Sequence, residues 1–470
     1  MLAEVESRYD LFSIAVKGIS LWRLLRFEVA QQLQNLELSR ISLSRGALLK
    51  SLPRAARQYL RAPRGYRYLG KTSNSGLRGL DDRGYFDIYF DDLIDGVPGG
   101  AKLSSLDAGG YDVNERGARR DAVFDDTSII VASAVLGRIG ASSSSKPQFG
   151  ELSGILAREF DLPEFGTSHI ARKYKVFVAR RALYRHLLKR LRARSVLAAN
   201  TGQFALCMAA RDIGIPFVEM QHGLFTGSHP DCLPARALDA SADIMLPDML
   251  TVYGDYAAGL IADTALARQG KVRTVGNPAV EKGRDLRARS FRPDRRAPII
   301  TLAAQGTGDT YTASFLGEFL RHVSGDLTLN IRLHPGYDSR GDFERSGVLA
   351  DPRVRLMPGQ STPATHEVIA LSDLHLSVFS TCHYDALGIG TPTMVIPGAG
   401  YEAVEDLYRN GHARLLTSPR ELAEIVSARQ WLDVPEATSR RFFRPGYLNN
   451  MRTLLDELNV AEGSRDDHDC

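Results

Sequence analysis

The sequence predicts an α/β protein that contains two doubly wound sheet domains. Short apolar segments with strand character alternate with helical segments over residues 195–280, and a second alternation begins at Pro298. Between them lies the charged, apolar-poor segment 281–297, which we interpret as an interdomain linker. The length of 470 residues also exceeds that of one typical domain and suits two.

The element pattern gives the expected order of strands and helices. In the first alternation the strands are expected at 195–199, 216–220, 249–253 and 272–275. In the second alternation they are expected at 299–304, 327–333, 354–357, 374–378 and 393–396. Ahead of both, the helical spacing predicts one amphipathic helix over 9–36, and aromatic residues favour a strand over 85–94. A last helix is expected near 448–459.

These expectations divide the chain into five parts. They are an N-terminal helical and basic region (1–82), a first sheet domain (83–280), the linker (281–297), a second sheet domain (298–460) and a disordered tail (461–470).

Composition places the chain among ordinary globular proteins. Hydrophobic residues make up 44% and charged residues 24%. There is no uncharged apolar run of the length that a membrane-spanning helix needs, and the N-terminus lacks a signal pattern. The four cysteines include no C-x-x-C pair, so the sequence predicts neither a zinc site nor a disulfide framework. We expect a cytoplasmic protein.

The net charge of +4 conceals two basic segments. Residues 38–80 and residues 167–195 contain no acidic residue and ten basic residues each. Such segments attract polyanions or anionic lipid headgroups, so one interpretation is peripheral attachment to the inner face of the cytoplasmic membrane. The alternative is a pair of solvated basic helices. Nucleic acid is not expected, because no nucleic-acid-binding motif accompanies the charge.

A candidate site follows the predicted strand 216–220, where the loop opens with Gln221-His222-Gly223. Ligands of open parallel sheets bind at the carboxyl ends of the strands, so these residues are expected to face a crevice. His222 is then a candidate general base or orienting group, with Glu219 as its candidate partner. The alternative is a structural histidine bound to backbone.

Three polar loops follow strands of the second alternation and are candidates for phosphate binding. Small residues allow backbone N–H groups to approach a phosphate, and the N-terminus of a helix attracts it. Arg332 and His334 would add donors. Each loop alone is also compatible with an ordinary capped turn, but three at one sheet edge favour a nucleotide site. The loops are Gln305-Gly306-Thr307, Arg332 to Pro335, and Ser380-Thr381.

Together these motifs resemble a known family over about residues 195–400. The order QHG, GNP, QGT, RLHPG and ST-x-x-YDALGIGTPT resembles bacterial GT-B glycosyltransferases of surface polysaccharide assembly. FVEMQHGLFTGSHP followed by PD-x-L-x-V-x-G is similar to capsule polysaccharide biosynthesis proteins. The H-P and Ser/Thr pairs resemble those of sialyl- and Kdo-transferases that use CMP-activated sugars. CDP-glycerol glycerophosphotransferases are a more distant likeness.

The resemblance implies a GT-B-like fold, with two Rossmann-like domains facing a cleft. His334, Ser380 and Thr381 would contact the donor phosphate, and Asp385 stands where many of these enzymes have a Glu that holds the ribose hydroxyls. Gln221 and Gly223 would lie on the acceptor side with His222. An acidic D-D-G-like base motif has only a loose echo in residues 91–96. No metal and no cofactor are expected, since the nucleotide-sugar is a co-substrate.

The expected function is transfer of a sugar from a nucleotide-activated donor to a polysaccharide or glycolipid acceptor in capsule or surface polysaccharide biosynthesis. The expected partners are therefore a nucleotide-sugar and a glycan or lipid-linked acceptor. Three alternatives use the same architecture. They are a CDP-polyol phosphotransferase, a UDP-sugar 2-epimerase and a non-catalytic subunit of a polysaccharide assembly complex.

Overall fold

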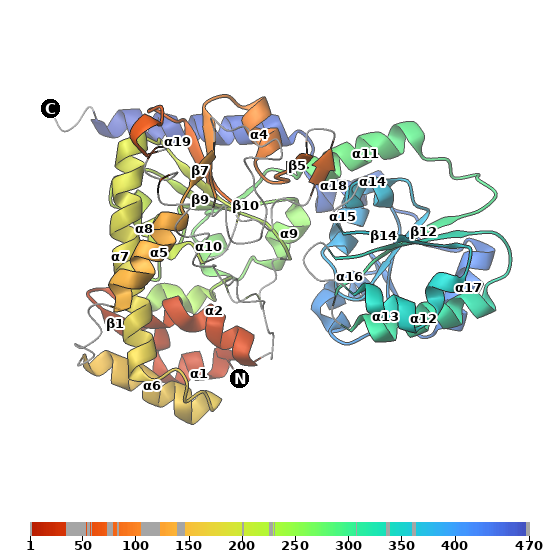
Figure 1. Ribbon diagram of the computed structural model, residues 1–470, viewed down its shortest axis with the longest axis horizontal. Coiled ribbons are helices and arrows are strands. Elements are labelled where there is room, and N and C mark those ends of the chain that lie inside the picture. The colour runs from red at the N-terminus through yellow and green to blue at the C-terminus, as the bar shows by residue number, and fades with distance from the viewer. Residues whose placement is uncertain are drawn as a thin grey trace.

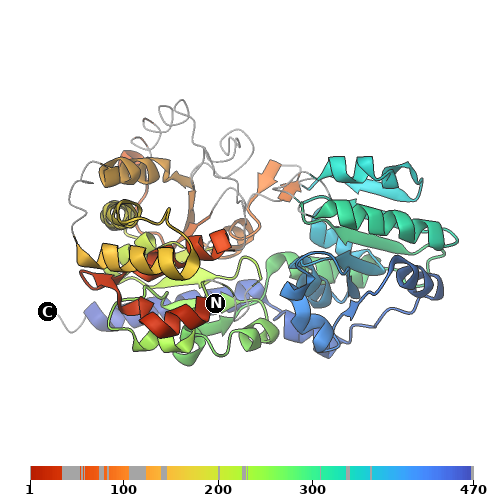
Figure 2. The same ribbon diagram turned by 90° about the horizontal axis from the view of Figure 1, so that it is seen from below.

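The molecule contains two α/β bodies that lie side by side (Figures 1 and 2). The computed structural model describes residues 2–33, 53, 57, 59–72, 79–81, 84–104, 123–138, 146–199, 202–224, 229, 231–306, 308–334, 339–359 and 363–466. One body holds a seven-stranded sheet and the other a six-stranded sheet, and neighbouring strands in both are parallel. The predicted fold class is therefore confirmed.

The first sheet has the order β11-β10-β9-β8-β3-β6-β7. Its strands are β3 (Tyr68–Lys71), β6 (Gly100–Ser104), β7 (Val123–Asp125), β8 (Val196–Ala198), β9 (Phe217–Met220), β10 (Met249–Val252) and β11 (Val272–Thr274). The last four follow the sequence prediction. β3 lies centrally, between β8 and β6, although the sequence assigned residues 1–82 to a helical region. Its residues are all buried, so it belongs to the core of the first domain.

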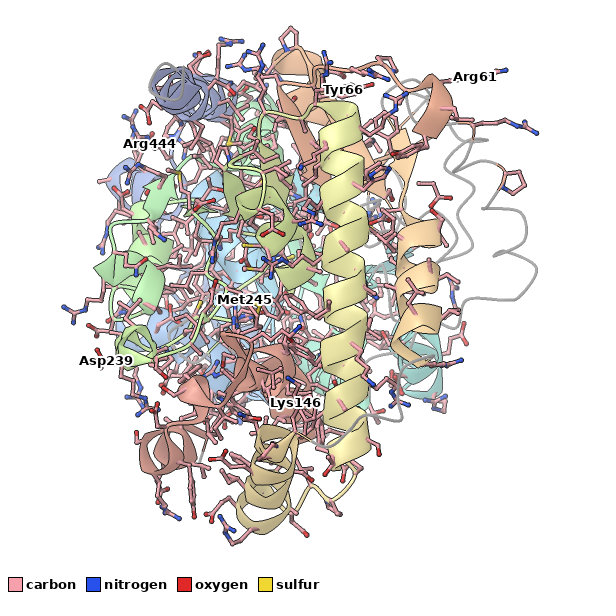
Figure 3. All side chains as sticks on the ribbon, turned by 90° about the vertical axis from the view of Figure 1, so that its left-hand side faces the viewer. Arg61, Tyr66, Lys146, Asp239, Met245 and Arg444 are labelled. Atoms are coloured by element: carbon pink, nitrogen blue, oxygen red, sulfur yellow. The ribbon has the colours of Figure 1, made fainter. Side chains whose placement is uncertain are left out.

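Helices lie on both sides of this sheet (Figure 1). They are α5 (Thr127–Arg138), α6 (Pro147–Phe160), α7 (Thr167–Leu191), α8 (Phe204–Arg211), α9 (Asp255–Leu260) and α10 (Ala265–Arg268). Figure 3 shows α7 running along the outer side of the domain with α5 beside it. The two helices approach closely at Gly137, where an added Cβ would lie 2.4 Å from Val176.

Two predicted elements of the N-terminal third are wrong. The helix expected over 9–36 is interrupted by a hairpin of β1 (Ala15–Val16) and β2 (Ile19–Ser20), because Lys17 and Gly18 form a turn with positive φ. Helices α1 (Leu2–Tyr9) and α2 (Leu21–Leu33) flank it. The strand expected over 85–94 ends early, as β5 (Gly84–Phe86), which pairs with β4 (Gly79–Asp81).

The chain leaves the strand direction at Asp87, whose carboxylate accepts hydrogen bonds from the N–H groups of Tyr89 (2.9 Å) and Phe90 (3.3 Å). Such Asp-to-backbone bonds favour a turn. The acidic motif that follows is helix α4 (Asp91–Gly96).

The second sheet has the order β14-β13-β12-β15-β16-β17. Its strands are β12 (Ile299–Ala303), β13 (Thr328–Arg332), β14 (Val354–Met357), β15 (Leu374–Ser377), β16 (Thr393–Val395) and β17 (Arg414–Leu415). The helices around it are α12 (Asp309–His322), α13 (Arg340–Arg345), α14 (Thr365–Ala370), α15 (Cys382–Ile389), α16 (Glu405–Arg409), α17 (Pro419–Ala428) and α18 (Glu436–Phe442). Its core is made of apolar strand residues and the inner faces of α12 and α17.

The two domains are joined by two crossings of the chain. The first is α11 (Pro278–Ser290), so most of the segment predicted as a linker is helical. Asn277 caps this helix by accepting a hydrogen bond from the N–H of Ala279 at 2.9 Å. The second crossing leads from α18 to α19 (Tyr447–Asp466), which returns to the first domain (Figure 1).

Helix α19 packs on the first domain, although the sequence assigned residues 298–460 to the second. Tyr447, Met451 and Leu455 share a core with Leu93 and Val97. Residues 461–466, which were predicted to be disordered, are the last part of this helix, and 467–470 lie outside the described residues.

Candidate active site

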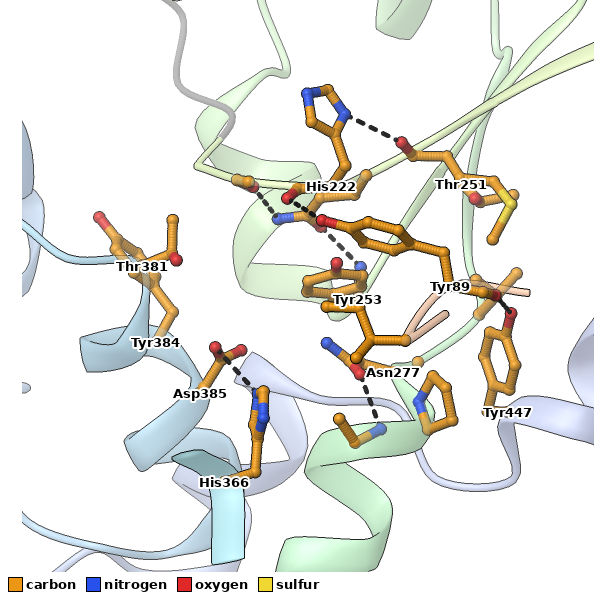
Figure 4. Close-up of a pocket in the computed structure, with 18 of the residues that line it drawn as sticks. Tyr89, His222, Thr251, Tyr253, Asn277, His366, Thr381, Tyr384, Asp385 and Tyr447 are labelled. Atoms are coloured by element: carbon orange, nitrogen blue, oxygen red, sulfur yellow. Dashed lines mark hydrogen bonds and ion pairs between the residues drawn. The ribbon is translucent and has the colours of Figure 1, made fainter. Parts of the chain in front are cut away.

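A cavity that is partly open to solvent lies between the two domains (Figure 4). The strand ends of the first domain supply Gln221, His222, Gly223, Thr251 and Tyr253, and the start of α11 adds Asn277 to Ala279. The second domain supplies His366, Thr381, Tyr384 and Asp385. This is the edge at which an open parallel sheet binds ligands. The fold thus brings Gln221, His222 and Gly223 of the predicted acceptor side and Thr381 and Asp385 of the predicted donor side to one space.

Gln221 holds the loop on the first wall. Its side-chain oxygen accepts a hydrogen bond from the N–H of Tyr253 at 2.8 Å, and its amide nitrogen donates to the carbonyl oxygen of Gly223 at 3.1 Å. Gln221 was predicted to lie on the acceptor side of the cleft. Because its amide is bound to backbone at both ends, Gln221 fixes the direction in which the chain leaves β9.

His222 follows Gln221 and lines the cavity. Its Nδ1 lies 3.4 Å from the carbonyl oxygen of Met220, and its own carbonyl oxygen accepts a hydrogen bond from the hydroxyl of Tyr89 at 2.8 Å. A carbonyl oxygen is only an acceptor, so the first contact favours the tautomer with its proton on Nδ1. In that tautomer Nε2 is an acceptor, which is the state that a general base requires.

Glu219 lies apart from His222. Side chains alternate along a strand, so Met220 of β9 faces the cavity, whereas Glu219 points to the opposite face. There it is buried, and burial together with the nearby Asp231 carboxylate raises its pKa to about 8. The predicted partnership of Glu219 with His222 is therefore not supported by the placement of the two residues.

The second wall centres on a pair that the sequence did not identify. His366 Nε2, on α14, lies 3.2 Å from a carboxylate oxygen of Asp385, on α15, and both line the cavity (Figure 4). Thr381, the N-cap residue of α15, also lines it. His366 was missed because it lies 19 positions before Asp385 in the sequence and only the packing of α14 on α15 brings the two together.

Ser380 lies next to Thr381 and contacts the start of α15. Its hydroxyl oxygen accepts a hydrogen bond from the N–H of Cys382 at 3.2 Å, so it takes part in starting α15. Of the residues predicted to bind the donor phosphate, the cavity lining includes Thr381 but not Ser380.

The described residues of the other predicted phosphate loops are not among those that line the cavity. The N–H groups of Gln305 (3.3 Å) and Gly306 (2.8 Å) donate to the buried carboxylate of Asp309. The protein's own acidic side chain thus occupies the donors that we expected to hold a phosphate. Thr307 and Pro335 lie outside the described residues.

Arg332 is only 2% exposed and donates from Nε to the hydroxyl of Thr365 at 3.2 Å. Burial lowers its pKa to about 10. His334 is half-buried and, like Arg332, is not among the cavity-lining residues. Arg332 is the last residue of β13, and His334 lies just beyond its end.

The acidic residues of α4 serve the structure. Asp91 accepts a hydrogen bond from the N–H of Asp87 at 2.8 Å and forms an ion pair with Lys102. Asp92 forms an ion pair at 2.6 Å with Lys282 of α11. Asp91 and Asp92, which loosely match an acidic base motif, therefore take part in structural contacts. These contacts hold the turn at Asp87 and helix α11, which is the first crossing between the domains.

Within the described part of the chain, no group of three or more His, Cys, Asp or Glu side chains is arranged to hold a metal ion. None of the helices that the structure describes is both long and apolar enough to cross a membrane.

Comparison with known proteins finds similar solved structures. The chain is similar to MurG of Acinetobacter baumannii (10% identity, TM-score 0.48, 83% of this chain and 99% of that one). It is also similar to a glycosyltransferase from Rickettsia africae ESF-5 (12%, 0.48, 84% and 97%) and to the wall teichoic acid polymerase TagF (9%, 0.45, 93% and 98%). No family model and no curated protein matches the chain. Identities this low leave the functional assignment to the residues of the cavity.

Proposed function

We propose that the chain is a glycosyltransferase that moves a sugar from a nucleotide-activated donor to a glycan or lipid-linked acceptor in bacterial capsule or surface polysaccharide assembly. The observation that carries the proposal is the cavity itself, which is lined by an imidazole from one domain and by a carboxylate and a hydroxyl from the other. A site between two domains suits a reaction with two substrates, because each domain can hold one of them.

The donor would bind on the second wall. His366 Nε2 lies 3.2 Å from one oxygen of the Asp385 carboxylate, and the other oxygen can accept hydrogen bonds from ribose hydroxyls. The hydroxyl of Thr381 and the N-terminus of α15 would face the phosphate groups, where the helix dipole favours negative charge. The displaced nucleotide would carry the negative charge of its phosphate groups as it leaves.

The acceptor would bind beside His222. Nε2 of the Nδ1-protonated imidazole takes the proton from an acceptor hydroxyl, and the hydroxyl oxygen forms a bond to the anomeric carbon of the donor sugar. The bond between that carbon and the phosphate oxygen breaks, and its electron pair leaves with the nucleotide. General-base catalysis of this kind contributes about 10²- to 10⁴-fold to a rate.

A thermal-shift panel of CMP, CDP, UDP and GDP tests the proposal. A ligand at 100 times its Kd adds about 2.7 kcal/mol to stability, so at least one nucleotide is expected to raise Tm by a few degrees. Stabilisation by none of the four would overturn the proposal. If a nucleotide binds but the transferred group proves to be a polyol phosphate, the site stands and the reaction class changes.

We also propose a cytoplasmic location with attachment to an anionic membrane surface through the outer face of α5 and α7 (Figure 3). Val135, Leu136 and Val178 are exposed there. Arg185 and Lys189 are exposed basic residues that lie on the same face of α7 as Val178. Apolar side chains among cations suit a lipid headgroup region better than a nucleic acid. The part of residues 38–80 beside α7 adds Leu60, whose carbonyl oxygen accepts a hydrogen bond from Arg190 at 2.9 Å.

Co-sedimentation with vesicles tests this attachment. The chain should pellet with vesicles of phosphatidylcholine and phosphatidylglycerol, and the R185E/K189E variant should pellet several-fold less. R345E, which replaces an exposed arginine of the second domain, is the matched control. Binding that is unchanged at high salt, or equal on pure phosphatidylcholine, would contradict the electrostatic account.

A further inference from the structure

We propose that Asp406 is a positioning residue that latches the two domains together behind the cavity, an inference that rests on the proposed function for its catalytic consequence. Its carboxylate joins side chains from both domains. One oxygen accepts a hydrogen bond from the hydroxyl of Tyr256, on α9 of the first domain, at 2.9 Å. The other accepts from the hydroxyl of Tyr384, on α15 of the second domain, at 2.7 Å.

The surroundings of this carboxylate fix the geometry of the latch. The Tyr256 ring stacks on Phe442 with centroids 4.2 Å apart, and Asn410 donates from Nδ2 to the Tyr256 hydroxyl at 3.2 Å. The ring of His412 stands edge-on to Tyr256 at 5.2 Å. Burial raises the pKa of both tyrosine hydroxyls, so they remain protonated donors to the carboxylate at neutral pH. Hydrogen bonds to an ionised acceptor are stronger than those between neutral groups.

The latch is continuous with the candidate active site. Tyr384 lines the main cavity and is the chain neighbour of Asp385. Tyr256 lines a smaller adjoining cavity together with Gln221, Tyr253, Tyr384 and Asp385. One end of the Tyr256–Asp406–Tyr384 bridge therefore adjoins the donor wall, and the other adjoins the residues that hold the His222 loop. Transfer requires reacting atoms to lie within about 3–3.5 Å, so a small separation of the walls would slow it.

The variant Y256F tests the latch with little change in shape. It removes the hydroxyl but keeps the ring that stacks on Phe442, and Y384F does the same at the other end of the bridge. Y311F is the matched control, since Tyr311 is an exposed tyrosine of α12 in the second domain. D406N supplies a variant of similar volume without the charge. Circular dichroism and melting curves identify any variant that does not fold.

Two readouts decide the outcome. Small-angle X-ray scattering of the full chain should show a larger radius of gyration for Y256F and D406N than for the wild type and Y311F. Turnover should show a kcat at least tenfold lower for Y256F, while the Kd of the nucleotide identified in the thermal-shift panel changes less than twofold. A radius of gyration unchanged in Y256F and D406N would overturn the latch, even if kcat falls.

The two proposals can fail separately. Scattering needs no substrate, so the latch is tested even if no nucleotide binds the wild type. Lack of nucleotide binding with an expanded Y256F would overturn the proposed function and leave the latch in place.

Discussion

The hydroxyl of Tyr89 donates a hydrogen bond to the carbonyl oxygen of His222 at 2.8 Å. This bond uses the main chain of the histidine, so it fixes the loop without engaging the imidazole. Tyr89 is in turn held by Asp87, which accepts from its N–H group. The turn after β5 and the loop after β9 thus form one unit on the first wall of the cavity, and the imidazole is carried by a supported backbone.

Replacement of His222 by Gln should separate chemistry from binding. The bond from Tyr89 to the main chain survives this change, so the loop should keep its place. We expect kcat to fall by about 10²- to 10⁴-fold, while the nucleotide Kd stays within twofold of the wild type. Steady-state kinetics and calorimetry provide the two values. H322Q, on the exposed end of α12, is the matched control. Loss of nucleotide binding in H222Q would make His222 a structural residue.

Stability should depend on pH through Glu219. Its pKa is raised to about 8 by burial and by Asp231, from an ordinary value of 4.5. Between these values the folded chain holds a proton that the unfolded chain releases, so the stabilising effect is complete below pH 4.5. It is lost as the pH rises through about 8. The loss should be on the order of a few kcal/mol.

The variant E219Q cannot ionise, so this component of the pH dependence should vanish. The free energy of unfolding in urea at pH 6 and at pH 9 should fall more in the wild type than in E219Q. E318Q, which changes an exposed glutamate of α12, should behave as the wild type does. Equal pH dependence in the wild type and E219Q would show that Glu219 is ionised throughout this range.

The fold is predictable where local pattern decides structure. Strands such as β12 and β15 lie buried in a parallel sheet, so each appears in the sequence as a short apolar run followed by a polar loop. Elements whose geometry depends on one turn were not predictable in the same way. The hairpin at Lys17-Gly18 and the turn at Asp87 interrupt segments whose periodicity favours a continuous helix or strand.

Part of the candidate site was also predictable from the local pattern of strands and helices. His222, Thr381 and Asp385 lie at strand or helix ends, and the doubly wound pattern brings such ends to one edge. The position of His366 depends on how α14 packs on α15, and the use of the Gln305 and Gly306 amides depends on the direction of the Asp309 side chain. Neither relationship leaves a periodic signal in the chain.

The close approach of α18 to the first domain, just before the chain crosses between the domains for the second time, requires a glycine at position 254. An added Cβ at Gly254 would lie 2.4 Å from the main chain at Phe442, which backbone atoms cannot relieve cheaply. G254A should therefore lower stability by about 1–3 kcal/mol. G259A, five residues later in α9, meets nothing within 4 Å and should raise stability by about 0.5–1 kcal/mol. Thermal melts report both signs, and equal Tm values would contradict the close crossing.

Calorimetric titration of the wild type and D385N with the nucleotide found in the thermal-shift panel tests the central claim most directly. That claim is that the second wall holds the ribose through Asp385. Hydrogen bonds to a charged group contribute about 1.5–3 kcal/mol, so D385N should bind the nucleotide roughly 10- to 100-fold more weakly. D294N, at an exposed position before β12, should bind as the wild type does. Equal affinity of D385N and the wild type would contradict the assignment of the donor site to this cavity.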